Sequence, residues 1–179
     1  MEGGSRKAVR RMIAPNVTEY DLEFRWPLSE RSETDMIIVH HTGNPVDDDC
    51  SAEDIHRSHL AQGWSGIGYH YVIRKNGAIE EGRPEWARGA HAEDDNWHSI
   101  GIHVSGNFNI GVPTQPQIES LAYLVGYLCD KYDLIPTAET VKGHRDVDAT
   151  ACPGDNLYNI MQTIRGKSIW YMQHYQGGD

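Results

Sequence analysis

The sequence predicts a single α/β domain, and three observations support this prediction. The chain has 179 residues, which is long enough to bury a core and short enough to form one domain. Hydrophobic residues make up 39% of the chain and charged residues 23%, as in ordinary globular proteins. Short β-branched runs alternate with stretches of helical periodicity, and this alternation is typical of α/β folds.

The N-terminal part is expected to contain an arm, a strand and a helix. Residues 1–34 are polar, carry both charge signs and lack sustained periodicity, so we expect an arm that packs on the domain. Residues 36–41 (MIIVHH) form an apolar run closed by Gly-Asn-Pro, which predicts a buried strand ending at two histidines. Ser51 begins a capping-box pattern and Gly63 is a suitable stop, so a helix is predicted between them.

The middle of the chain predicts a hairpin, a strand and a long helix. An Asn-Gly pair between two extended runs indicates a β-hairpin over residues 69–82. Residues 98–106 (HSIGIHVSG) alternate with period 2, as a strand does. Thr114, followed two residues later by proline, predicts the N-terminus of an amphipathic helix that continues to Tyr132.

A strand at residues 140–142 and a helix near residues 156–165 complete the predicted domain, which we place at residues 35–166. The remaining residues, 167–179, are expected to form a tail. Its aromatic stretch IWYMQHYQ is predicted to pack on the protein's own core, with a dimer contact as the alternative. We therefore expect a monomer.

Charge and hydropathy exclude several classes of partner. The formal net charge of -10 argues against nucleic acid, because such binding depends on Lys and Arg. The basic residues that do cluster are Arg6, Lys7, Arg10 and Arg11, so attraction to an anionic surface would be local. No apolar run is long enough to span a bilayer, and the N-terminus lacks the apolar stretch of a signal peptide. A cytoplasmic location in the producing cell is therefore expected.

Candidate metal ligands stand near both ends of the predicted domain. His144 and Cys152 lie eight residues apart across a loop with Gly, Asp and Pro, which can bring both side chains onto one ion. Imidazole and thiolate together favour zinc. A third ligand can come from the end of the first strand, where alternation allows only one of His40 and His41 to face the ion.

Five motifs extend this interpretation, and they occur in the order VHHTGNP, GIGYHYVIRKNG, GAHA, SIGIHVSGNF and GHRDVDATACPGD. Together they resemble the zinc-dependent N-acetylmuramoyl-L-alanine amidases related to peptidoglycan recognition proteins and phage amidase lysozymes. The resemblance covers about residues 36–165. It implies a central mixed β-sheet flanked by helices, and peptidoglycan as the substrate.

The resemblance also implies which residues carry the chemistry. Zinc would be held by His40, His144 and Cys152, leaving a fourth position for water, whose pKa zinc can lower to about 7. The family's active-site tyrosine corresponds to Tyr69, whose hydroxyl could stabilise the developing oxyanion or position the water. Thr150 stands where family members carry Lys or Thr and could donate a hydrogen bond to the same oxyanion.

Three further residues are candidates for contact with substrate. His91 and Asn107 correspond to groove-lining positions, where they would hydrogen-bond the peptide stem or sugar or else support a loop. His103 occupies a position where relatives carry varied residues, including carboxylates, so both an acid or base role and simple packing stay open. Cys50 and Cys129 are expected to be a surface thiol and a small core residue without function.

Two other classes of function compete with a zinc amidase. A peptidoglycan-binding module that does not cut would lack the metal-binding cysteine, so Cys152 argues against it. A metal-free hydrolase could use Cys152 as the nucleophile with His40 or His144 as its base, and chelation would separate the two enzymes. Among the amidases, the recycling branch commonly has a carboxylate as third ligand. The cysteine therefore favours lysis of the cell wall after release from the cell.

Overall fold

The computed structural model describes residues 10–177 of the protein, and within these residues one six-stranded sheet has the order β1-β4-β3-β5-β2-β6. Its strands are β1 (Val17–Thr18), β2 (Met36–His41), β3 (Tyr71–Ile73), β4 (Ile79–Glu81), β5 (Ser99–Val104) and β6 (Val141–Gly143). β3 and β4 pair antiparallel and the other neighbours pair parallel. The predicted single α/β domain with a central mixed sheet is confirmed.

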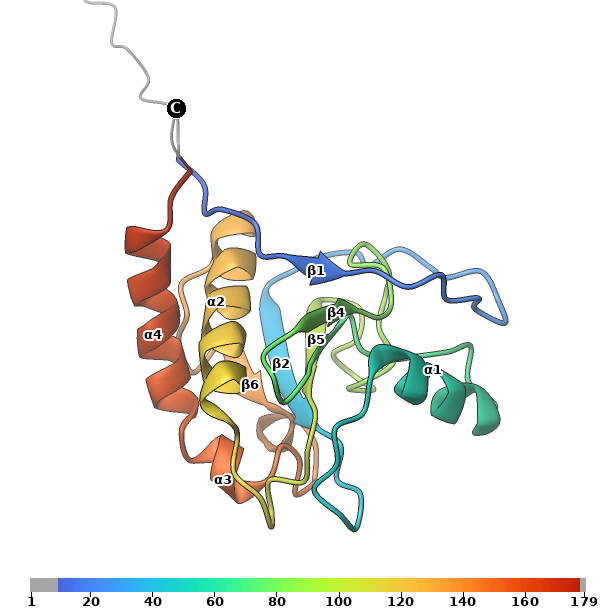
Figure 1. The fold of residues 1–179 in the computed structure, drawn as a ribbon. Helices are drawn as coiled ribbons and strands as arrows, with labels where there is room; N and C mark the ends of the chain where they lie inside the picture. The colour runs from blue at the N-terminus through green and yellow to red at the C-terminus, as the bar shows by residue number, and fades with distance from the viewer. Residues whose placement is uncertain (1–9, 178–179) are drawn as a thin grey trace, which may run out of the picture.

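The helices cover both faces of this sheet. They are α1 (Ala52–Ala61), α2 (Gln115–Lys131), α3 (Asp155–Tyr158) and α4 (Met161–His174), with a single 3₁₀ turn, η1 (His144–Asp146), directly after β6. α2 and α4 lie side by side on one face, and α1 lies on the other side of the sheet (Figure 1). Within residues 10–177 no helix combines the length and the apolar character needed to cross a membrane.

Strand alternation gives the two faces of the sheet different contents. Alternate residues of β2 and β5 are buried in the core that α2 and α4 cover, namely Ile37, Val39, Ile100, Ile102 and Val104. The residues between them point the other way, and His40 of β2 and His103 of β5 are partners in the parallel register. Two buried histidines are therefore placed together on the α1 side of the sheet.

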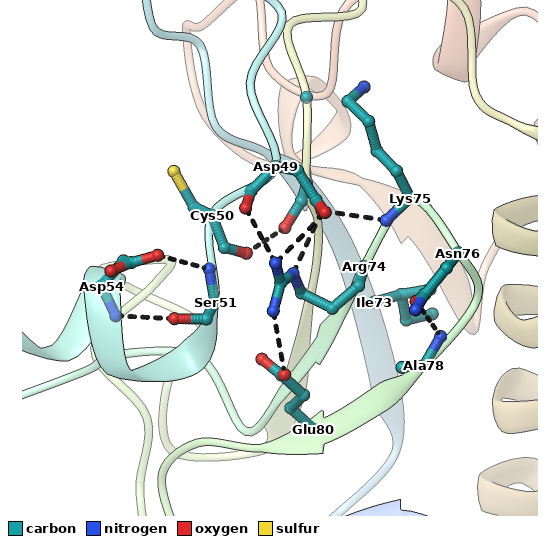
Figure 2. A network of polar contacts seen from close by, with 12 residues as sticks. Asp49, Cys50, Ser51, Asp54, Ile73, Arg74, Lys75, Asn76, Ala78 and Glu80 are labelled. Atoms are coloured by element: carbon teal, nitrogen blue, oxygen red, sulfur yellow. Dashed lines mark hydrogen bonds and ion pairs between the residues drawn. The ribbon is translucent and has the colours of Figure 1, made fainter.

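A polar network fixes the N-terminus of α1 to the β3–β4 hairpin (Figure 2). Arg74 Nη1 lies 3.2 Å from Glu80 Oε2, and Arg74 Nε lies 3.1 Å from Asp49 Oδ1. Ser51 and Asp54 form the predicted capping box, in which the Asp54 backbone N–H donates to Ser51 Oγ at 3.1 Å. Because these contacts join a loop, a helix end and a hairpin, α1 is held firmly beside the sheet.

The elements expected in the middle of the chain are confirmed. β2 covers the predicted residues 36–41, the hairpin of β3 and β4 lies within residues 69–82, and β5 lies within residues 98–106. Thr114 caps α2 in a capping box with Gln117, and α2 ends one residue before Tyr132. Hydrophobic periodicity and capping residues were enough to predict these elements, because each element is amphipathic or fully apolar.

The two ends of the chain pack on the domain, as expected, but they contain more regular structure than the sequence predicted. The arm contributes β1, a short edge strand parallel to β4, and Met12 forms an isolated bridge with Gln176. The single helix expected near residues 156–165 is two helices, and α4 continues to His174, through most of the segment expected to be a tail. Packing of α4 on α2 stabilises these extra turns. The basic residues Arg6 and Lys7 lie outside the described residues.

Candidate active site

The two histidines that end β2 point to opposite faces, as strand alternation predicts. His41 packs against Phe108, and its Nδ1 accepts a hydrogen bond from the Phe108 backbone N–H at 3.1 Å. His40 is only 1% exposed and faces the α1 side of the sheet. The choice that strand alternation left open is therefore decided in favour of His40, the residue that the resemblance implied.

His40, His144 and Cys152 converge at the carboxyl end of β2. His144 begins η1 directly after β6, and Cys152 follows on the loop that leads to α3. One possible ligand atom from each residue lies within 4.8 Å of the others. Cys152 Sγ is 3.7 Å from His40 Nδ1 and accepts a hydrogen bond from the His41 backbone N–H at 3.3 Å. The structure thus brings together the three residues predicted as metal ligands.

The electrostatics of this cluster suit a soft cation. Burial, together with the neighbouring histidines, holds the pKa of His40 well below its usual range, so the ring keeps its lone pair at neutral pH. Burial also raises the pKa of the Cys152 thiol to about 12, although the His41 N–H and Arg145 oppose the shift. A thiolate here needs a cation to stabilise it. Two imidazoles and one thiolate are a donor set that fits zinc.

Tyr69 lies directly over this cluster. Its ring centroid is 4.9 Å from those of both His40 and His103 and 5.7 Å from that of His59. Burial, with a smaller contribution from Cys152, raises the pKa of Tyr69, so the phenol stays protonated and can donate a hydrogen bond. None of the described residues forms a hydrogen bond with its hydroxyl, which is left available for a substrate atom.

Thr150 lies on the same loop as Cys152. Its Oγ1 accepts a hydrogen bond from the Cys152 backbone N–H at 3.2 Å. Since a hydroxyl both accepts and donates, its hydrogen can still be donated to another group. The arrangement is compatible with the predicted role in oxyanion stabilisation, which stays a prediction.

Two cavities flank Tyr69 and differ in polarity. The larger, of about 450 Å³, extends between Trp64 and the loop after β4, and is lined by Trp64, Tyr69, Ala90, His91, Ala92, Glu93, Asn96, His144 and Asp148. The smaller, of about 180 Å³, lies against α1 and is lined mainly by polar groups, among them Asn44, Asp54, Ser58, His59 and His103. A substrate that crosses Tyr69 would therefore contact one mostly apolar wall and one polar wall.

The three residues predicted to contact substrate have different surroundings. His91 lines the larger cavity but is 9% exposed, with its Nδ1 2.9 Å from His40 Nε2. Asn107 lines neither cavity, and its side chain bonds the backbone of Asn44 and of Asn109. Its surroundings match the loop-supporting role, and contact with substrate stays a prediction.

His103 lines the smaller cavity and is 1% exposed. Its Nε2 lies 3.1 Å from Thr42 Oγ1, whereas its Nδ1 is buried without a partner among the described residues. Burial, reinforced by His41 and His59, lowers the pKa of His103 to about 3. The ring is therefore neutral at neutral pH, which argues against a role as general acid.

Sequence reasoning missed two residues at this site. Trp64, just after α1, is 42% exposed and forms a wall of the larger cavity beside His59. Asp148 lies four residues after His144, and its Oδ2 is 2.8 Å from His144 Nε2. A carboxylate at this spacing within a ligand motif was a signal that could have been used. Of the cysteines, Cys129 is buried as expected, but Cys50 is half-buried rather than a surface thiol.

A mixed sheet carries a His, His, Cys cluster at the carboxyl end of its central strands, beside a half-buried tyrosine and a cavity of about 450 Å³, an arrangement compatible with a hydrolase that could hold a metal ion. Comparison with known families makes the assignment specific. Residues 30–155 match the model of the N-acetylmuramoyl-L-alanine amidase family. The chain belongs to this family.

Individual relatives agree with this assignment. The endolysin of Escherichia phage T7 is 32% identical over 139 residues, covering 74% of this chain and 89% of that protein. The solved structure of the N-acetylmuramoyl-L-alanine amidase LysC from Clostridium intestinale has a TM-score of 0.78 and 40% identity, covering 86% of this chain and 97% of that one. Drosophila PGRP-LB, a peptidoglycan recognition protein, has a TM-score of 0.71 and 26% identity, covering 83% and 93%.

Proposed function

We propose that the protein is a zinc-dependent N-acetylmuramoyl-L-alanine amidase that hydrolyses the amide between N-acetylmuramic acid and L-alanine in peptidoglycan. Family membership supports the reaction and the substrate. The observation that carries the metal dependence is the convergence of His40, His144 and Cys152, whose possible ligand atoms lie within 4.8 Å of one another. These three residues would hold the ion.

The residues around the cluster suit amide hydrolysis. Zinc, when bound at such a site, supplies a Lewis acid that polarises a carbonyl and lowers the pKa of water. The protonated Tyr69 phenol would donate to the carbonyl oxygen as negative charge develops there, and the Thr150 hydroxyl would act in the same way. Hydrolysis adds water across the C–N bond and releases a carboxyl group on the muramic acid and an amino group on L-alanine.

The alternatives are less well supported. A metal-free cysteine hydrolase needs an accessible thiolate, whereas burial raises the pKa of Cys152 to about 12 and its His40 neighbour is held neutral. A recognition module that only binds is suggested by the names of the peptidoglycan recognition relatives alone. The complete set of candidate ligands, His40, His144 and Cys152, and the larger cavity beside Tyr69 favour cleavage.

The biological setting is part of the proposal. Relatives named endolysin, such as that of phage T7, support a role in breaking down the cell wall. We expect the chain to be made in the cytoplasm, to reach the wall after release from the cell, and to act as a monomer.

The test measures new amino termini of L-alanine and new reducing sugar released from purified peptidoglycan, with and without a chelator. A zinc amidase releases amino termini and no reducing sugar, loses this activity on chelation and recovers it with zinc. Cys152→Ser should lower the rate by at least about 1000-fold, because removing one ligand removes several kcal/mol of metal-ion stabilisation. Activity that survives chelation would indicate the cysteine nucleophile, and binding without cleavage would indicate a recognition module.

A further inference from the structure

His91 stands directly behind His40, away from the metal cluster. Its Nδ1 is 2.9 Å from His40 Nε2, and the two rings meet edge to face with centroids 5.0 Å apart. On the other side of the His91 ring, Nε2 lies 3.4 Å from Ser99 Oγ. His91 therefore links a metal-ligand histidine to the first residue of β5.

The direction of each hydrogen bond that links Ser99, His91 and His40 can be deduced. The Ser99 hydroxyl donates its single hydrogen to the Asp95 backbone carbonyl at 2.7 Å. The contact between Ser99 Oγ and His91 Nε2 must then have the His91 Nε2–H as donor. His91 Nδ1 consequently carries a lone pair and accepts the Nε2–H of His40. This leaves the His40 lone pair on Nδ1, the atom that lies 3.7 Å from Cys152 Sγ.

The space for the His91 ring is provided by two glycines. A Cβ at Gly101 would lie 2.6 Å from ring atoms of His91, and a Cβ at Gly89 would lie 2.5 Å from its Cδ2. Gly101 is inside β5, where glycine weakens a strand and often marks a close approach of another group. The backbone is fixed as well, since Asn96 Oδ1 accepts hydrogen bonds from the N–H groups of His91 and Ala92.

His144 has a comparable partner on its own loop. Its Nε2 lies 2.8 Å from Asp148 Oδ2, and the Asp148 side chain is 35% exposed. A carboxylate at this distance accepts the Nε2–H, so the His144 lone pair is also left on Nδ1. His40 and His144 thus have the same tautomer. His40 donates to the neutral, buried ring of His91, whereas His144 donates to the carboxylate of Asp148 beside the larger cavity.

We propose that His91 and Asp148 are positioning residues that fix His40 and His144 as Nδ1 ligands of the metal. The inference rests on the proposed zinc site, and it gives His91 a role through His40 in place of the direct substrate contact that the sequence suggested. Outer partners of this kind orient the ring and raise its basicity, and their loss typically costs about 10- to 100-fold in metal affinity.

The test measures zinc affinity without substrate, by competition with a chromophoric chelator. His91→Phe fills the ring space but removes the acceptor, and should weaken zinc binding by about 10- to 100-fold. His91→Asn can place an amide oxygen near the position of Nδ1 and should retain most of the affinity. Asp148→Ala should weaken binding, and Asp148→Asn, which keeps an acceptor, should weaken it less. His174→Phe, at the exposed end of α4, is the matched control and should change nothing.

A second variant keeps the test decisive if His91→Phe does not fold. Gly101→Ala leaves His91 in place but crowds its ring, so it should also weaken zinc binding. The visible spectrum of the cobalt-substituted protein should change in the variants that displace a ligand ring. In zinc-limited assays kcat should fall, with recovery at high zinc.

Each outcome separates this inference from the proposed function. If the native protein fails to bind zinc, or Cys152→Ser binds it equally well, the proposed metal site itself is wrong. If the native protein binds zinc and His91→Phe binds it equally tightly with only a raised KM, His91 contacts substrate and the positioning role is overturned. Unchanged affinity in Asp148→Ala would overturn the same role for Asp148.

Discussion

The two faces of the central sheet use the same strands for different purposes. On the α2 and α4 face, β2 and β5 present Ile and Val side chains to a continuous apolar core. On the α1 face the same strands present His40 and His103, and the space above them contains Tyr69 and His91. One face stabilises the fold, and the other accepts buried polar groups because a site has to be built there. Changes on one face should therefore leave the property of the other intact.

The largest expected effect is on the face of the sheet that α2 and α4 cover, which we call the core face. Leu124 is fully buried in α2, so Leu124→Ala should lower the free energy of unfolding by about 2–5 kcal/mol. Urea denaturation followed by circular dichroism measures this loss. The kcat of the folded fraction and its zinc affinity should stay at native values. A change in zinc affinity would show that the two faces are coupled.

The converse change is Tyr69→Phe on the α1 face of the sheet, which we call the site face. It removes one hydrogen-bond donor to the developing oxyanion and should lower kcat by about 100-fold. Stability should hardly change, because the ring remains and the hydroxyl has no partner among the described residues. Steady-state kinetics with a soluble muropeptide and thermal melting give the two values. Native kcat in this variant would remove Tyr69 from the mechanism.

The site face should also make the fold sensitive to acid. Burial lowers the pKa of both His70 and His103 to about 3 in the folded protein, below the usual value of 6.5. The unfolded chain then binds more protons below pH 6.5, so stability is full above that pH and falls as pH drops toward 3. Each fully buried histidine changes the free energy of unfolding by about 1 kcal/mol per pH unit in this range.

Urea denaturation at pH 7, 6 and 5, in the presence of a chelator so that zinc release does not contribute, measures this slope. His103→Asn should reduce the slope of the unfolding free energy against pH by the contribution of one buried histidine. His98 provides the opposite sign: burial opposes its protonation, but hydrogen bonds to Asp35 and Asp95 raise its pKa. Its contribution is present at low pH and lost as pH rises above its folded pKa. An unchanged slope in His103→Asn would mean that this ring is protonated in the fold.

The smallest expected effect concerns a helix end on the core face. Thr114 caps α2 and accepts a hydrogen bond from the Gln117 backbone N–H at 3.2 Å. Thr114→Ala should cost about 1 kcal/mol, and Thr114→Ser should restore most of it. Thermal melting detects this difference, and activity at 25 °C should stay native. If both variants melt with the native protein, the cap contributes nothing measurable.

Elements with a clear local pattern could be predicted from the sequence. β2, β5, the hairpin and α2 carry a period, a turn pair or a capping box that acts within a few residues. β1 and the extension of α4 could not, because both depend on contacts with distant segments: β1 pairs with β4, and α4 packs on α2. Short edge strands and weakly amphipathic helices take their stability from such packing.

By itself the sequence determined the α/β class, the strand that ends in two histidines, and, through five ordered motifs, the family and its candidate ligands His40, His144 and Cys152. The tertiary structure alone showed that His91 and Asp148 lie behind the two histidines, and it placed His40, the residue that the motifs implied, on the side of the cluster. Spacing along a chain limits which residues can meet. The direction of a side chain and its hydrogen-bond partners depend on strands and loops distant in sequence, so only the folded protein fixes them.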